Sequence, residues 1–262
     1  MILARITKAI REQNWFAVVL EFIIVIAGVV IGFQVTAWNE GRVRESRAVA
    51  MQDRLAVDLE AERWRIAATS LYLEDMVSEA EQALQALDGT QTLSDEQLVI
   101  RAFRGSQYFW AGILRSTYDE LVFSGEINLL PDNIFRNAAI EYYNSSTTSL
   151  LSEPGETPYR NAFRQSLSPA LHRELVANCA EDPNVQIGDY DALEQFLDFP
   201  CEIDGLDSDI AALAERLRND GTLVGLLRWR VIEAEQNQTN MVYFGDLLDR
   251  ALADYRDRKT TP

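Results

Sequence analysis

The sequence predicts an all-α protein, in which a single N-terminal transmembrane helix continues into a long stalk helix and an antiparallel helical bundle lies outside the membrane. Three observations predict this fold class. The 22 residues between Trp15 and Trp38 carry one formal charge, that of Glu21. Residues 42–88 contain neither proline nor glycine, and their apolar residues recur at helical spacing. A second long helical pattern covers about residues 221–256.

The segment 15–38 has the length and the end residues of a membrane-spanning helix. At about 1.5 Å per residue it reaches roughly 33 Å, enough to cross a hydrocarbon core of about 30 Å. Trp15 and Trp38 mark its ends, and tryptophan favours membrane interfaces. A cleaved signal peptide has a shorter apolar core and a small-residue cleavage site, whereas this segment ends in Trp-Asn-Glu-Gly-Arg. We therefore expect a retained anchor rather than a signal peptide or a buried core helix.

Basic residues flank both ends of this anchor, so their distribution does not set its orientation. Its position at the start of the chain favours a cytoplasmic N-terminus. The only two cysteines, Cys179 and Cys201, bracket a polar segment that a disulfide would stabilise in an oxidising compartment; the alternative is two unpaired buried thiols. We predict a short basic cytoplasmic tail over residues 1–14 and an acidic helical domain over residues 39–262.

The stalk helix is predicted over about residues 42–88. The spacing of its apolar stripe is close to that of a coiled-coil seam, but such a stripe is more often the core face of a helical bundle. The stripe consists of Leu55, Leu59, Ile66, Leu73, Val77, Ala80, Leu84 and Leu87. Gly89 marks the end of this helix, and Ser94 with Gln97 forms a capping box at the start of the next one.

Later elements follow from turn residues and apolar spacing. A helix that ends at Gly125 is followed by a tight turn and a helix opened by Pro131. Tyr142 and Tyr143 at its end are expected to close a core rather than to form a binding platform. We expect a helix end and loop over 145–149 and 152–158, a helix over 159–178 and a short helix near 207–218. The last long helix, 221–256, has these apolar candidates: Leu223, Leu227, Trp229, Ile232, Met241, Phe244, Leu248 and Leu252.

Composition argues against several functions. The chain has 24 basic and 41 acidic residues and a formal net charge of −17, which disfavours nucleic acid as a partner. It has a single histidine, His172, no recognisable nucleophile motif, too few His and Cys ligands for typical zinc sites and no glycine-rich phosphate loop. We therefore predict no catalytic, cofactor-binding or metal-binding residue, although the many carboxylates leave a carboxylate-pair hydrolase open.

Two separated segments carry a family resemblance. They contain Gln13-Asn14-Trp15-Phe16-Ala17-Val18, Gly28, Ile31-Gly32, Gln34-Val35 and Trp38-Asn39, together with Thr117-Tyr118-Asp119-Glu120-Leu121 and Ser124-Gly125. In these residues the chain resembles a family of uncharacterised bacterial single-pass membrane proteins. The resemblance implies an N-terminal anchor and a helical extramembrane domain, and it transfers no catalytic residue. We accordingly predict a bacterial inner-membrane protein with a cytoplasmic N-terminus and a periplasmic domain.

One face of the anchor is the strongest candidate site. At 100° per residue, Glu21, Val25, Gly28, Gly32 and Thr36 share this face. Gly28 and Gly32 form a GxxxG motif, which lets two helices approach closely. Glu21 favours a protein environment within the span; alternatively, its side chain snorkels toward the headgroups.

We therefore expect a non-catalytic interaction or scaffold protein that packs against another transmembrane helix, either as a homo-oligomer or as an accessory subunit of an inner-membrane complex. One alternative is a periplasmic sensory domain. Because so few residues precede the span, such a sensor would have to signal through a separate partner. The other is an anchored carboxylate-dependent hydrolase.

Overall fold

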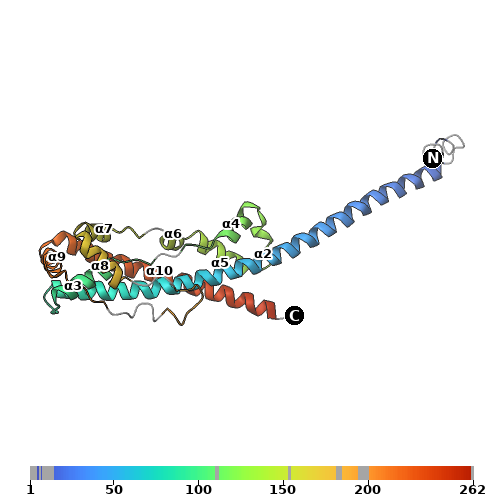
Figure 1. Cartoon of the computed structure of the whole chain (residues 1–262). Helices are drawn as coiled ribbons and strands as arrows, with labels where there is room; N and C mark the ends of the chain where they lie inside the picture. The colour runs from blue at the N-terminus through green and yellow to red at the C-terminus, as the bar shows by residue number, and fades with distance from the viewer. Residues whose placement is uncertain are drawn as a thin grey trace. The chain divides into compact units, whose positions relative to one another are not determined.

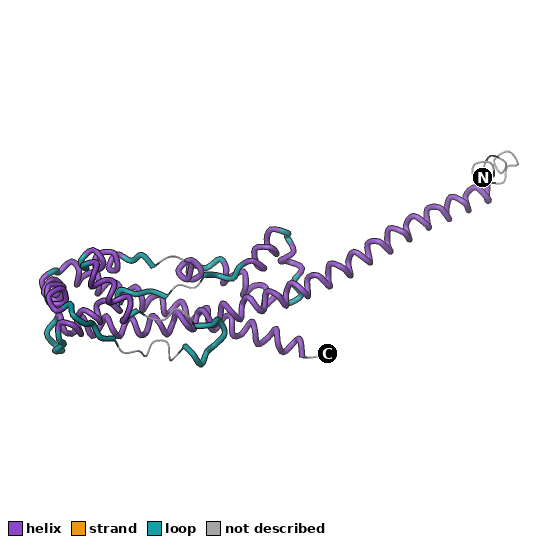
Figure 2. The backbone as a smooth tube through the Cα atoms, viewed as in Figure 1, coloured by secondary structure: helices purple, strands orange, loops and turns teal. Residues whose placement is uncertain are grey.

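The computed structural model describes residues 5, 7, 15–109, 112–152, 155–180, 185–193 and 201–260. Within these ranges the regular structure is helical and contains no strand, which confirms the all-α fold (Figures 1 and 2). The predicted tail 1–14 lies outside the described residues apart from Arg5 and Thr7. The elements are α2 (Trp15–Leu87), α3 (Asp95–Arg104), α4 (Ser116–Phe123), η1 (Glu126–Leu129), α5 (Asn133–Tyr143), α6 (Ser146–Ser152), α7 (Pro158–Gln165), α8 (Pro169–Cys179), α9 (Asp207–Asn219) and α10 (Gly221–Thr260).

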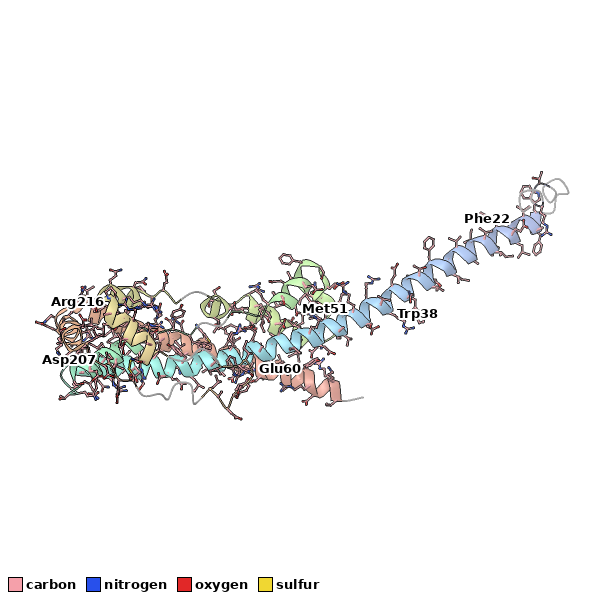
Figure 3. The ribbon with its side chains drawn as sticks, viewed as in Figure 1. Phe22, Trp38, Met51, Glu60, Asp207 and Arg216 are labelled. Carbon is pink, nitrogen blue, oxygen red and sulfur yellow. A yellow bond between two sulfur atoms is a disulfide. The ribbon has the colours of Figure 1, made fainter. Side chains whose placement is uncertain are left out.

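The chain divides into two compact units, and the division falls within α2. The first unit comprises residues 1–52 and 129–131, and the second comprises residues 53–128 and 132–262. In the first unit, α2 contains a stretch that is long and apolar enough to cross a membrane, judged by length and composition. None of its most apolar 18-residue window is buried within the chain. The side chains of Phe22 and Trp38 project from this helix and are largely exposed (Figure 3).

In the second unit, α10 runs antiparallel to the part of α2 that begins at Asp53. Ion pairs between the two helices show this antiparallel register. The later a residue lies in α10, the earlier its partner lies in α2. These pairs are Arg228 with Asp88 (2.8 Å), Arg63 with Asp249 (2.8 Å), Arg256 with Glu60 (2.7 Å) and Lys259 with Asp53 (3.2 Å). Such exposed pairs contribute about 0–1 kcal/mol each. They therefore mark the register, and the packed apolar faces supply most of the stability.

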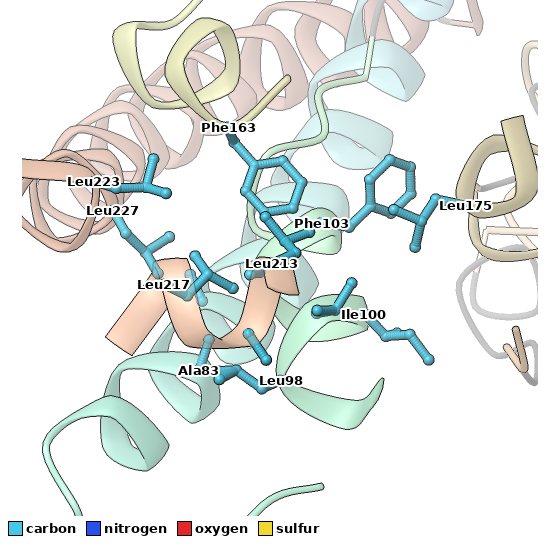
Figure 4. Packing of buried hydrophobic residues seen from close by; sticks show 14 of the residues in the cluster. Ala83, Leu98, Ile100, Phe103, Phe163, Leu175, Leu213, Leu217, Leu223 and Leu227 are labelled. Atoms are coloured by element: carbon cyan, nitrogen blue, oxygen red, sulfur yellow. The ribbon is translucent and has the colours of Figure 1, made fainter. Parts of the chain in front are cut away.

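The main apolar core lies where α3, α7, α8 and α9 meet the C-terminal end of α2 and the N-terminal end of α10. Phe103 of α3 is 1% exposed and Phe163 of α7 is fully buried. Around them, Figure 4 shows leucines from several helices, among them Leu98, Leu175, Leu213, Leu217, Leu223 and Leu227. The predicted stripe of the stalk helix is confirmed as a core face, because each of its members is buried or packs against a core cluster.

Local signals set several helix ends as expected. Gly89 has φ +78° just after α2, and the Ser94–Gln97 capping box is present at α3. Gly125, with φ +73°, follows α4. Pro131, however, does not open α5: the helix begins at Asn133, where the Asp132 carboxylate accepts the N–H groups of Ile134 and Phe135.

Two predictions between residues 145 and 178 were wrong. Residues 145–149 were expected to be a helix end and loop, but most of them lie in α6, in which Thr147 and Thr148 are buried, so tertiary packing overrides their weak helix propensity. The expected helix 159–178 is two helices, because Ser168 caps α8 and Pro169 occupies its first turn. Proline has no N–H and clashes with the preceding turn, so one continuous helix is disfavoured there.

Cys179 and Cys201 form a disulfide, with their Cα atoms 4.9 Å apart. Cys179 ends α8 and is fully buried in the main core. Close to Cys201, the N–H of Ile203 donates to the Glu96 carboxylate at 3.0 Å. The disulfide and this hydrogen bond together hold the segment before α9 against α3 and α8.

Replacing both cysteines, as Cys179→Ser with Cys201→Ser, should lower the free energy of unfolding by about 3 kcal/mol, because the sequence separation of 22 residues closes a loop of moderate length. Thermal unfolding of the full-length protein in detergent measures the loss. Wild type treated with reductant serves as the control and should unfold at the temperature of the double variant. Equal unfolding temperatures for oxidised wild type and the variant would contradict the prediction.

Candidate functional site

The predicted anchor face lies on the first part of α2 and is open. A Cβ added at Gly28 or Gly32 would meet no atom within 4 Å other than the local helix backbone. Val25 is exposed and Glu21 is partly exposed. The Thr36 hydroxyl donates to the Gly32 carbonyl at 3.0 Å, so it is satisfied within the helix. Apart from the Glu21 carboxylate, the face therefore offers close packing rather than hydrogen bonds, and its role in association stays a prediction.

The second unit contains a fully buried carboxylate, Glu62 of α2. One carboxylate oxygen accepts the Leu114 N–H at 2.7 Å and lies 3.3 Å from the Arg65 guanidinium. The other accepts the Tyr142 hydroxyl at 2.6 Å. The side chains of Glu62 and Arg65 are both 0% exposed. This carboxylate therefore ties α5 and the segment before α4 to α2.

The two tyrosines at the end of α5 belong to the same cluster. The Tyr143 hydroxyl donates to the Leu114 carbonyl at 2.6 Å, and its ring stacks on Tyr118 with centroids 4.6 Å apart. Tyr142 and Tyr143 are 0% and 2% exposed, which confirms that they close a core. Leu114 is thus held through both its N–H and its carbonyl group.

Burial raises the pKa of the Glu62 carboxyl, while Arg65 and the hydrogen bonds from Tyr142 and Leu114 act in the opposite direction. Burial also raises the pKa of Tyr142. Because Glu62 is enclosed and both of its oxygens have partners, the cluster clamps the fold rather than presenting a reactive group to a substrate.

Glu62 was not singled out from the sequence, although a signal exists. It occupies the gap between Leu59 and Ile66, where the apolar stripe of α2 skips one turn. Arg230 was also missed. The apolar pattern of α10 was expected to bury Trp229 and Ile232, but these are 55% and 53% exposed and Arg230 is 6% exposed. The sequence of α10 carries no comparable signal, because Arg228 interrupts the same apolar pattern and lies on the surface.

Other candidates for chemistry have little support. A cavity of about 460 Å³ is lined by Glu60 and Asp249, but each carboxylate is paired with an arginine, Arg256 and Arg63 respectively. Burial and neighbouring arginines lower the pKa of His172. In the described part of the chain, no group of three or more His, Cys, Asp or Glu residues could hold a metal ion.

Comparison with protein-family models, with curated proteins and with solved structures finds no match for this chain. The family resemblance carried by the anchor and by residues 117–125 therefore stays a prediction.

Glu62 makes the stability of the second unit depend on pH. Because the folded pKa is raised, the stabilising contribution of Glu62 is complete below its ordinary pKa of 4.5 and is lost as the pH rises through the folded pKa. Relative to Glu62→Gln, the wild type should lose about 1.4 kcal/mol of unfolding free energy for each unit by which the pKa is raised. Urea unfolding at a series of pH values measures this difference.

The matched control is Glu60→Gln, two residues away on the surface. This variant also removes one carboxylate from α2, but an exposed one that pairs with Arg256 on the surface, so it controls for the loss of a charge without the loss of a buried group. A constant difference between Glu62→Gln and wild type over the pH series would show that the buried carboxylate has no raised pKa.

Proposed function

We propose that this protein is a membrane-anchored, non-catalytic interaction protein of the bacterial inner membrane, which associates through the N-terminal part of α2 with another transmembrane helix. The observation that carries the proposal is an apolar stretch that is not buried within the chain and has two open glycines, Gly28 and Gly32. Such a surface is stable only against lipid or against another apolar helix.

The composition of the face favours a second helix over lipid alone. Glycines four residues apart allow two backbones to approach closely, and the satisfied Thr36 hydroxyl adds no unpaired donor to the contact. Glu21 lies on the same face, and an acid within a span prefers a protein environment. A second copy of the chain is the simplest partner, because a face on a two-fold axis packs against itself. An accessory role in a larger complex is the other form of the same proposal.

The disulfide between Cys179 and Cys201 supports a periplasmic location for the second unit, because such bonds persist in oxidising compartments. The cytoplasmic N-terminus follows from this location if the apolar stretch spans the membrane once. The resemblance to uncharacterised bacterial single-pass membrane proteins supports the same arrangement.

Changing Gly28 and Gly32 together to isoleucine should abolish association in mild detergent, because two added side chains keep the backbones apart. The mass of the purified full-length protein, by size exclusion with light scattering, should fall from that of the assembly to that of one chain. The matched control is Ala37→Ile, another small residue, placed about 180° from Gly28 around the helix. An unchanged mass in the glycine variant, or an equal loss in Ala37→Ile, would count against the proposal.

Topology is tested with single cysteines placed in the Cys179→Ser, Cys201→Ser chain. Thr260→Cys, at the exposed end of α10, should react with a membrane-impermeant maleimide in intact spheroplasts. Thr7→Cys, in the predicted tail, should react only after the membrane is permeabilised. The reverse pattern would place the second unit in the cytoplasm.

A further inference from the structure

A cavity of about 170 Å³ lies in the second unit among α2, α10, the segment after α3 and the start of α7. Aromatic rings contribute to its lining, as do both signs of charge. The aromatic residues are Tyr72, Tyr108 and Phe109. The charged residues include Arg230 and Glu233, one turn apart on α10, and Asn237 follows one turn later. The cavity thus combines apolar walls with a few convergent polar groups, the usual composition of a small-molecule site.

The two charges are poorly satisfied by the chain itself. The Arg230 Nη1 lies 3.6 Å from the Glu233 carboxylate, longer than the pairs between α2 and α10. Its Nη2 donates to the Gln107 carbonyl at a long 3.3 Å. Among the described residues, neither Arg230 Nε nor Glu233 Oε2 has a hydrogen-bond partner, although both atoms are buried. Buried polar atoms without partners are rare in native structures, and a bound water, ion or ligand is a common explanation for them.

Burial of Arg230 is costly unless its charge is compensated. Its side chain is 7% exposed, and burial lowers its pKa. An ion pair at this depth rarely recovers the cost of desolvation by itself. A ligand carboxylate on Arg230 would supply short, charge-assisted hydrogen bonds that the present contacts do not supply.

The aromatic wall is held in place by specific contacts. The Arg160 guanidinium lies 4.5 Å from the centroid of the Tyr108 ring. Arg160 is itself fixed by the Ser106 carbonyl at 2.9 Å and the Gln107 side chain at 3.2 Å. On the other side, a Cβ on Gly155 would overlap the Tyr108 ring, so only glycine permits this close approach. The Tyr108 side chain is therefore held in position without a ligand.

Size and charge together define the ligand. A cavity of about 150 Å³ holds a molecule the size of benzene, so this one suits a molecule of about six to eight non-hydrogen atoms. We propose that it binds a small zwitterionic α-amino acid, with the carboxylate on Arg230, the ammonium group on Glu233 and an aliphatic side chain against Tyr72 and Phe109. Both charged groups of an amino acid are attached to one carbon, which matches the short separation of Arg230 and Glu233.

Calorimetric titration of the full-length protein in detergent tests this site with L-alanine and L-valine as probes. Propionate and propylamine, which each carry one of the two charges, are titrated in parallel. We expect an amino acid to bind, and neither single-charge compound to bind comparably. Glu233→Gln and Arg230→Met should each weaken amino-acid binding at least about tenfold, the effect of removing one charged partner.

Arg228→Met is the matched control, because Arg228 lies on the same helix and pairs on the surface with Asp88. It should bind the amino acid as wild type does. If Arg230→Met fails to fold, Glu233→Gln still decides, because Glu233 is about one-third exposed. The proposal is overturned if neither amino acid binds wild type, if propionate or propylamine binds equally well, or if Glu233→Gln binds as tightly as wild type.

Discussion

The apolar face that α2 presents after Asp53 has to be removed from water, and this constraint places the other helices of the second unit. Leu55, Leu59 and Ile66 are almost fully buried along it. At about 25 cal/mol per Å² of apolar surface, covering such residues is the main source of stability. α10 covers much of the length as an antiparallel partner, and shorter helices complete the core beside Phe103. The ion pairs between α2 and α10 fix the register, and they add little energy.

Charged residues occur within these apolar faces and serve two different purposes. Glu62 is completely enclosed, and both of its oxygens have partners, so it holds α5 and Leu114 in place. Removing one partner would leave a buried charge uncompensated, which is strongly destabilising. Arg230 is almost as buried, but its hydrogen bond to the Gln107 carbonyl is long at 3.3 Å and its side chain lines a cavity. The first arrangement is typical of a structural clamp and the second of a binding site.

The two units follow opposite rules of burial. In the first, apolar side chains such as Phe22 and Val25 are exposed, and small residues lie open to a neighbour. In the second, apolar side chains such as Leu55 and Phe103 form buried cores, although Trp229 and Ile232 are exposed. The proposed association uses only the first unit, and the proposed amino-acid site uses only the second. The two proposals can therefore fail independently.

The sequence by itself determined the helical class, the apolar stretch and the two long helices, because these depend on local properties. Helical periodicity, the capping box at Ser94 and the glycine at position 89 all act within a few residues of the chain. The core role of Tyr142 and Tyr143 was also predictable, because aromatic residues at a helix end usually pack inward. Local signals did not predict α6, where the burial of Thr147 and Thr148 outweighed their weak helix propensity.

Only the tertiary structure decided which charged residues are buried and what surrounds them. Glu62 contacts Tyr142 across 80 positions of sequence, and the cavity beside Arg230 combines four separate segments. Such contacts depend on how helices pack, and the spacing of residues along one helix does not specify the opposing side chains. Within α10, periodicity predicted a buried face but placed Trp229 and Ile232 on it. The rotation of the helix was set by packing against α2, and that rotation buried Arg230 instead.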